Sequence, residues 1–170
     1  MHQHAGAEFM CDSKPVEEAI IKCCIEKGCS LATAESCTGG LIAHRLTNVP
    51  GASAVFLGGV VAYANAAKMA LLDVPEAVIA ERGAVAEAVA VAMARGARAR
   101  FDADYAVAVT GIAGPGGGTL EKPVGTVYLA VMGPASQRVR HCLFQGDRDA
   151  VKTQTAEAAL QLLFELLETS

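Results

Sequence analysis

The sequence predicts an α/β fold: a three-layer α/β/α sandwich with a mixed five-stranded sheet. Apolar residues make up 52% of the 170 residues and charged residues only 19%, which favours a folded domain with a full core over disorder. Segments with helical periodicity are interleaved with five short apolar runs that are typical of strands. The last two runs are joined by a tight turn, which favours an antiparallel pair. We expect a flexible leader over residues 1–13 and a single domain over residues 14–170.

Six segments are predicted to be helices because apolar residues recur in them at helical spacing. The first ends at Gly28, and the last begins at Asp147 and turns Ala156, Leu160 and Leu163 inward. These helices would form the two outer layers. They are predicted over residues 14–27, 41–46, 65–72, 75–82, 85–100 and from 147 onward.

Five apolar runs are predicted to be strands, and their surroundings indicate how buried each one is. The run 105–109 lies between acidic residues and a Thr-Gly pair, and it has the form of an inner strand covered on both faces. The run 54–63 is interpreted as a buried strand interrupted by two glycines. A turn at residues 133–136 joins the last two runs into a hairpin. The predicted strands cover residues 30–34, 54–63, 105–109, 124–132 and 138–144.

Charge and hydropathy exclude two classes of partner. With 14 basic and 18 acidic residues the net charge is −4, which argues against a nucleic-acid partner. The longest apolar stretch, residues 55–72, is interrupted by Asn65, by Lys68 and by a glycine pair, so we expect no membrane span.

The six cysteines are interpreted as reduced thiols of a cytoplasmic protein. No secretory leader precedes them, and they do not form paired C-x-x-C units with partnering histidines. We therefore expect neither a metal nor a cofactor. The six are Cys11, Cys23, Cys24, Cys29, Cys37 and Cys142.

The first candidate segment, residues 34–40, lies where a predicted strand gives way to a helix. Unpaired backbone N–H groups at a helix start suit an anion or a developing oxyanion, and Ser36 would stand beside them. Gly39 and Gly40 would let a ligand approach the backbone closely. From the residues alone, Ser36 is a nucleophile or an N-cap, and Cys37 is a rival nucleophile or a small buried hydrophobe.

The second candidate segment, residues 60–68, places Tyr63 at the end of a strand and Lys68 five residues later. Lys68 either extends its stem along the surface with its ammonium in water or acts as a desolvated base. The second role requires burial and neighbouring dipoles to lower the pKa of the amine toward neutrality. Tyr63 would then donate or share the proton.

Two further segments are candidates for ligand contacts. The glycine-rich loop 111–118 follows a buried strand but matches neither standard phosphate-loop motif, so on its own it is a long turn or a ligand contact. Arg148, at the start of the last helix, either clamps a phosphate or carboxylate or is an exposed residue beside Asp147 and Asp149.

Taken in order, the four segments resemble the C-terminal domain of the competence/damage-inducible CinA family, which includes nicotinamide mononucleotide deamidases. The matching runs are AESCTGG, GGVVAYANAAK, TGIAGPGGGTLEKPVGTVYLA and FQGDR, and the similarity extends from about Val16 to Leu167. The resemblance implies a three-layer α/β/α fold and hydrolysis of the nicotinamide carboxamide to nicotinate mononucleotide and ammonia. It also implies a metal-independent mechanism built on serine and lysine.

Carried over residue by residue, the resemblance assigns catalysis to Ser36, Lys68 and Tyr63. Two positions depart from the family pattern: Ala64 stands where a serine is common, and Lys152 stands where an arginine is common. Many relatives carry an additional N-terminal molybdopterin-binding-like domain, whose pyrophosphatase activity we do not transfer to this chain. We expect the substrate to contact Glu35, Cys37, Thr38, Gly39, Gly40, Asn65, Thr110, Gly111, Gly114 and Arg148.

In the expected mechanism Ser36 attacks the carboxamide carbon, while neutral Lys68 takes its proton and later protonates the leaving ammonia. Backbone N–H groups after Ser36, with the turn at residues 110–111, would hold the oxyanion. Two alternatives stay open: a non-catalytic nucleotide-binding or scaffold module, and an amidase for another small amide. A homo-oligomer formed through the alanine-rich face 85–99 is a further open alternative.

Overall fold

The computed structural model describes residues 14–170 and contains a mixed five-stranded sheet, as predicted. The strand order is β2-β1-β3-β4-β5. The first three neighbours in this order run parallel, and β3, β4 and β5 form an antiparallel meander. The leader expected over residues 1–13 lies outside the described residues. The strands are β1 (Leu31–Glu35), β2 (Phe56–Val61), β3 (Tyr105–Gly111), β4 (Thr126–Met132) and β5 (Gln137–Leu143).

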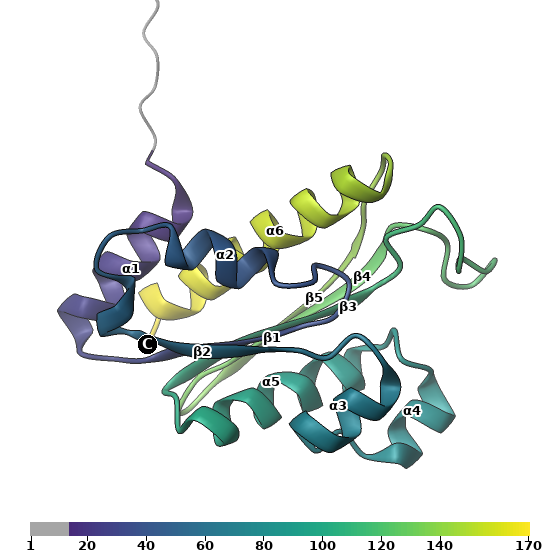
Figure 1. The fold of residues 1–170 in the computed structure, drawn as a ribbon, viewed down its shortest axis with the longest axis horizontal. Coiled ribbons are helices and arrows are strands. Elements are labelled where there is room, and N and C mark those ends of the chain that lie inside the picture. The colour runs from purple at the N-terminus through teal and green to yellow at the C-terminus, as the bar shows by residue number, and fades with distance from the viewer. Residues whose placement is uncertain (1–13) are drawn as a thin grey trace, which may run out of the picture.

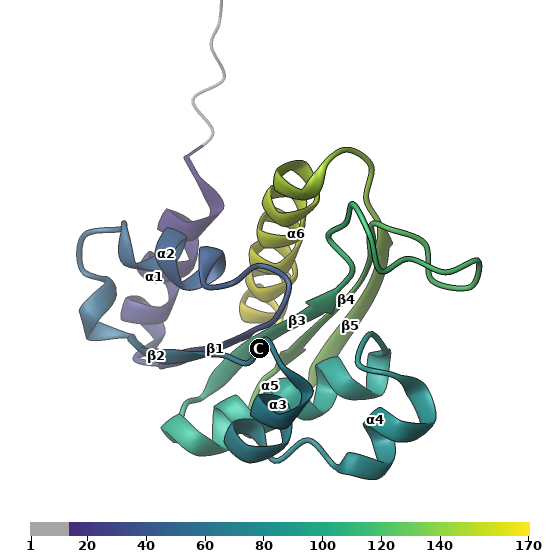
Figure 2. The same cartoon turned by 45° about the vertical axis from the view of Figure 1, so that its right-hand side comes forward.

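Helices cover both faces of the sheet, which confirms the three-layer sandwich (Figures 1 and 2). One face carries α1 (Val16–Lys27), α2 (Leu41–Thr47) and α6 (Arg148–Glu168). The other face carries α3 (Asn65–Leu72), α4 (Glu76–Arg82) and α5 (Glu87–Phe101). Apart from β2, every predicted helix and strand begins and ends within two residues of its observed bounds.

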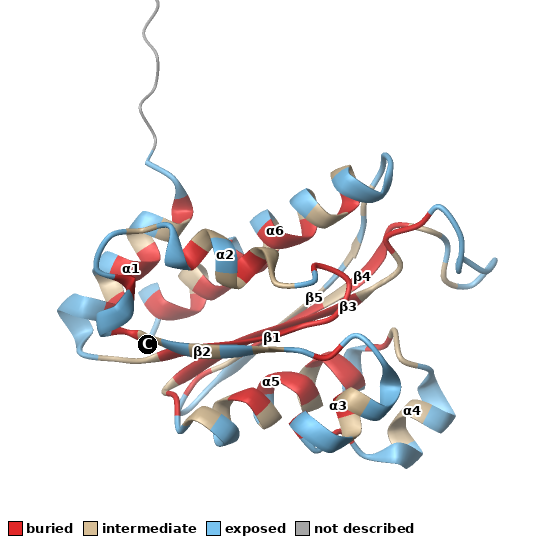
Figure 3. Ribbon diagram, viewed as in Figure 1, coloured by how far each residue is buried: buried red, intermediate tan, exposed pale blue. Residues whose placement is uncertain are grey.

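Buried residues lie on both sides of the sheet (Figure 3), and strand alternation divides them into two clusters of different composition. Large aliphatic residues such as Leu31 and Leu129 face α1 and α6, whereas alanines such as Ala32 and Ala108 face α5. Small side chains let a helix approach a sheet closely. Helices α3 and α5 also pack closely at Gly96 of α5, which has no Cβ. A Cβ there would stand 2.0 Å from the carbonyl oxygen of the last residue of α3, so only glycine allows this approach. This contact fixes α3, the helix that carries the candidate lysine.

The prediction of a buried strand over residues 54–63 is wrong in its bounds and in its burial. A 3₁₀ turn (Ala52–Ala54) precedes β2, and every second residue of β2 is exposed. The reason is that β2 lies at the edge of the sheet, where it has one neighbouring strand and one incompletely covered face. Its apolar composition alone could not distinguish this position from a central one.

Candidate active site

The candidate segments meet where the three parallel strands end. The last residue of β1, Glu35, pairs with Val61 of β2 and Val109 of β3. The chain continues this pairing by one residue, because the N–H of Ser36 donates to the Val109 carbonyl at 3.1 Å. Ser36 and Thr110 therefore lie on adjacent strands at the carboxyl edge of the sheet. In α/β proteins this edge is the usual place for a ligand.

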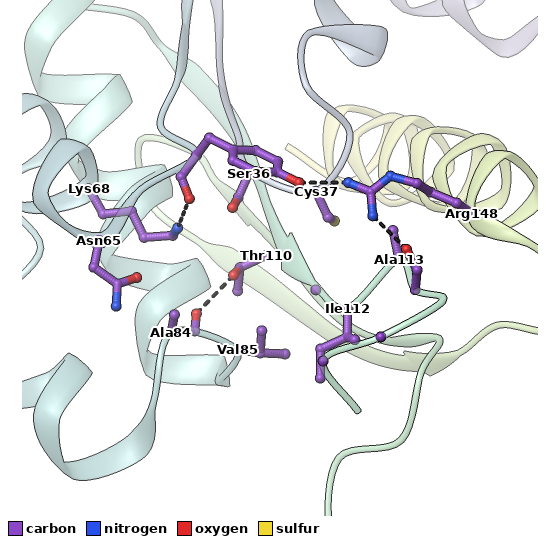
Figure 4. A pocket seen from close by; sticks show the side chains of 15 residues that line it. Ser36, Cys37, Asn65, Lys68, Ala84, Val85, Thr110, Ile112, Ala113 and Arg148 are labelled. Atoms are coloured by element: carbon purple, nitrogen blue, oxygen red, sulfur yellow. Dashed lines mark hydrogen bonds between the residues drawn. The ribbon is translucent and has the colours of Figure 1, made fainter. Parts of the chain in front are cut away.

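A cavity of about 270 Å³ opens at this edge, and it brings together nine of the residues expected at the site (Figure 4). They are Ser36, Cys37, Tyr63, Asn65, Lys68, Thr110, Gly111, Gly114 and Arg148. The cavity wall also includes Ile112, Ala113, Gly116 and Gly117 of the glycine-rich loop 111–118, and Ala84 and Val85, which the sequence did not mark as site residues. Among residues 14–170 no aspartate or glutamate lines the cavity, and its basic groups are the Lys68 amine and the Arg148 guanidinium.

Lys68 lies on α3 with only 2% of its surface exposed, and it points into the cavity. Its ammonium nitrogen donates to the backbone carbonyl of Tyr63 at 3.2 Å. Within residues 14–170 no carboxylate forms a salt bridge with it. Desolvation disfavours the charged form and lowers the pKa of the Lys68 amine below its usual value. An amine in this position is suited to act as a base.

Ser36 is 7% exposed, and its hydroxyl points into the same cavity (Figure 4). The neighbouring thiol is a poor rival for the role of nucleophile. Burial raises the pKa of the Cys37 thiol to about 12, and the charge of Glu35 acts in the same direction. Cys37 is therefore protonated at neutral pH, and a thiol is far less nucleophilic than a thiolate.

The expectation that Glu35 contacts the substrate is wrong, because its side chain is fully buried beneath α2. Its carboxylate accepts hydrogen bonds from the N–H groups of Gly40, Ile42 and Ala43 and from the Thr38 hydroxyl, at 2.6–3.1 Å. Glu35 thus satisfies the orphan donors at the start of α2. Those donors cannot hold a substrate oxyanion.

Thr38, Gly39 and Gly40 do not line the cavity, so the substrate contacts expected there stay a prediction. The Thr38 hydroxyl is committed to Glu35 at 2.6 Å. The two glycines have φ angles of +62° and +104°, in the left-handed region that favours glycine. They turn the chain from β1 into α2.

Tyr63 and Arg148 contact each other at the mouth of the cavity. The Arg148 guanidinium donates to the Tyr63 hydroxyl at 2.6 Å and to the carbonyl of Gly114. Tyr63 reaches Lys68 through its backbone carbonyl, not its hydroxyl. The expectation that the tyrosine hydroxyl shares the lysine proton is therefore not supported by this geometry, because that hydroxyl faces Arg148.

Thr110 closes the wall opposite Ser36. Its hydroxyl donates to the carbonyl oxygen of Ala84 at 2.8 Å, and its side chain is buried. Ala84 belongs to the short link between α4 and α5, a segment without a motif or a polar side chain. No sequence signal identifies such a residue, because it contributes only its backbone.

Within residues 14–170 no group of three or more metal-ligating side chains converges on one point. None of the helices in this part of the chain combines the length and the apolar composition needed to cross a membrane.

The fold and the cavity define an α/β protein with a buried serine and a buried lysine at the carboxyl edge of its sheet. The chain belongs to the CinA C-terminal domain family, whose model matches residues 13–167, so the resemblance inferred from the four motifs is confirmed. It is 55% identical to a CinA-like protein of Geobacter sulfurreducens over 155 residues and 49% identical to one of Geotalea uraniireducens over 158 residues. The matches cover 91% and 93% of this chain, and the chain spans 38% of the length of each relative.

Solved structures of the same family share the fold. One is the competence/damage inducible protein CihA from Agrobacterium tumefaciens, with a TM-score of 0.87 and 42% identity over 89% of this chain and 93% of that one. Another is a competence-damaged protein (CinA) superfamily protein from Escherichia coli, with a TM-score of 0.86 and 35% identity over 89% and 88%.

Proposed function

We propose that this chain hydrolyses the carboxamide of nicotinamide mononucleotide to nicotinate mononucleotide and ammonia. One observation carries the proposal: the Lys68 amine is buried without an acidic partner in the same cavity as the Ser36 hydroxyl. This pairing of a hydroxyl nucleophile with a desolvated amine base is a known way to activate serine without histidine or metal.

The hydrogen bonds of Lys68 suit a general base. A neutral amine has two protons and one lone pair, and one proton is committed to the Tyr63 carbonyl. The lone pair is then free to accept the proton of Ser36. Because burial lowers the pKa of Lys68, the neutral form is more populated than it would be in water.

In the first step the oxygen of Ser36 attacks the carboxamide carbon, and its proton passes to Lys68. The backbone N–H of Cys37, which follows the nucleophile and is not bound by Glu35, is the donor that we assign to the oxyanion. Lys68 then protonates the nitrogen, the C–N bond breaks and ammonia leaves. Lys68 then takes a proton from water, whose oxygen attacks the ester carbon. The bond to the Ser36 oxygen breaks, Lys68 returns the proton to that oxygen, and nicotinate mononucleotide leaves as the carboxylate.

The charge of the cavity supports a phosphorylated substrate. Even with Lys68 neutral, the Arg148 guanidinium lines it, and among residues 14–170 no acidic side chain does. Arg148 stands at the mouth beside the glycine-rich loop, where a guanidinium can bind a phosphate through two parallel hydrogen bonds. The reacting carboxamide would then lie deeper, between Ser36 and Thr110.

The test is ammonia release from nicotinamide mononucleotide by the purified chain and its variants. Ser36→Ala and Lys68→Ala should each lower turnover by at least about 10³-fold, because each removes a group that acts in the transition state. Ser136→Ala and Lys22→Ala change the same residue types on the exposed surface and should retain activity. Circular dichroism checks that each variant is folded.

Three results would contradict the proposal. Binding of nicotinamide mononucleotide without turnover by the unmodified chain would indicate a nucleotide-binding module. Release of ammonia only from other amides would indicate a different substrate. Full turnover by folded Ser36→Ala would remove the nucleophile from the mechanism.

A further inference from the structure

The Thr110 hydroxyl faces the cavity with lone pairs only. A threonine hydroxyl has a single proton, and this one is donated to the Ala84 carbonyl at 2.8 Å. The direction of this bond is fixed, because a carbonyl oxygen can only accept. Toward the cavity, Thr110 can therefore accept a hydrogen bond but cannot donate one. The hydroxyl itself therefore contributes no donor to an oxyanion hole.

Thr110 lies within reach of any group bound to Ser36. The two residues continue neighbouring parallel strands in register, and such strands are about 4.8 Å apart. Figure 4 shows the side chains of Ser36, Lys68 and Thr110 converging on one space. All three side chains are buried.

We infer that Thr110 Oγ1 is a specificity-determining acceptor that binds the N–H of the scissile carboxamide and disfavours the carboxylate product. This inference rests on the proposed function. A primary carboxamide presents two N–H donors to the lone pairs of Thr110. The carboxylate presents only lone pairs, which repel those of Thr110 and leave the Thr110 acceptor without a partner on the product.

The same contact changes along the reaction in the direction that turnover needs. When Lys68 protonates the leaving nitrogen, that nitrogen gains a positive charge and a third donor, so its bond to Thr110 strengthens. Once ammonia has left and water has cleaved the ester, the new carboxylate oxygen meets the acceptor. Rotating the Thr110 hydroxyl toward the product would deprive the Ala84 carbonyl of its hydrogen bond.

The experiment compares the binding of nicotinamide mononucleotide and nicotinate mononucleotide by calorimetry. Ser36→Ala serves as the background, so that the amide is not consumed. With Thr110 present, the amide should bind at least about tenfold more tightly than the acid. Thr110→Val keeps the shape but removes the acceptor, and the ratio should fall to within about threefold. Thr110→Ser keeps the hydroxyl and should keep the preference.

Two results would overturn the inference: an unchanged amide-to-acid ratio in folded Thr110→Val, or a loss of that ratio in Thr110→Ser. If Thr110→Val does not fold, inhibition of the unmodified chain by nicotinate mononucleotide replaces the binding comparison. An inhibition constant for this acid below the KM of the amide would contradict the inference. Ammonia release by the unmodified chain separates the two proposals. If ammonia is released but the amide-to-acid binding ratio does not respond to the Thr110 variants as expected, only the role of Thr110 is wrong. If no amide is hydrolysed, the proposed function itself is wrong.

Discussion

At the scale of single residues, the chemistry of Lys68 comes from burial rather than from an acidic neighbour. Desolvation is the main cause that lowers its pKa, and its one hydrogen bond goes to a neutral carbonyl. The same burial carries a cost in stability. A charged lysine is better solvated in the unfolded chain than in this cavity.

This cost depends on pH with a definite sign. The unfolded chain binds the Lys68 proton up to its usual pKa of 10.5, whereas the folded protein releases it at lower pH. Between these two values the unfolded state binds more protons, so the contribution of Lys68 to stability rises with pH. The stability cost of burying the Lys68 charge is complete below the pKa of Lys68 in the folded protein. It disappears above the pKa of this lysine in the unfolded chain.

We therefore expect Lys68→Met to be more stable than the unmodified chain at neutral pH, with an advantage that shrinks toward about pH 10. Urea unfolding of both proteins across this range measures the difference in free energy of unfolding. Lys22→Met is the matched control, because the Lys22 side chain is 76% exposed and should give no such trend. A difference for Lys68→Met that does not change with pH would contradict desolvation as the cause.

The one-residue step between Glu35 and Ser36 shows where sequence reasoning reached its limit. Because side chains alternate along a strand, Glu35 points to the same side of the sheet as Leu31 and lies under α2. Ser36 points to the other side, toward α3 and the cavity. The motif AESCTGG predicts that this turn belongs to the functional site. It does not say which of its polar side chains hold the turn and which face the ligand, because that division depends on the register of the neighbouring strands.

At the scale of elements, α3 carries Lys68 but begins without a side-chain cap. Its N-cap residue is Ala64, whose backbone is extended, with φ −84° and ψ 154°, as an N-cap requires. The departure from the family pattern, an alanine where a serine is common, falls on this residue. The missing serine therefore corresponds to a missing N-cap oxygen at the start of α3.

Ala64→Ser should stabilise the protein by about 0.5–2 kcal/mol, because the serine oxygen can accept from an N–H in the first turn of α3. Thermal or urea unfolding measures the change. Ala66→Ser is the matched control: it makes the same substitution at an exposed position inside α3 and should slightly destabilise the helix. Equal effects of the two substitutions would show that position 64 is not a cap.

At the scale of the whole molecule, the site joins segments that are far apart in the chain. Ser36 follows β1, Lys68 lies on α3, Thr110 is in β3 and Arg148 begins α6. The sequence predicted the fold and these four segments because each has a local pattern. It could not predict the Ala84 carbonyl or the pairing of Tyr63 with Arg148, because those contacts depend on how α4, α6 and the glycine-rich loop pack.

Arg148 links three of these segments, since it starts α6 and binds both Tyr63 and the glycine-rich loop at Gly114. A phosphate would compete for the same guanidinium. We expect Arg148→Ala to raise the KM for nicotinamide mononucleotide by about 10–100-fold, the usual effect of losing a charge-assisted hydrogen bond, with a smaller effect on kcat. The KM for nicotinamide riboside, which lacks the phosphate, should change little.

Steady-state kinetics with the two amides measures this difference. Arg82→Ala is the control, because Arg82 is exposed at the end of α4 and pairs there with Glu81. Equal increases in KM for both amides would show that Arg148 orders the mouth of the cavity through Tyr63 and Gly114 rather than binding phosphate. An unchanged KM for the nucleotide would indicate that another cation binds the phosphate. The next candidate is Lys152, which lies one turn further along α6 and is close enough to lower the pKa of Cys37.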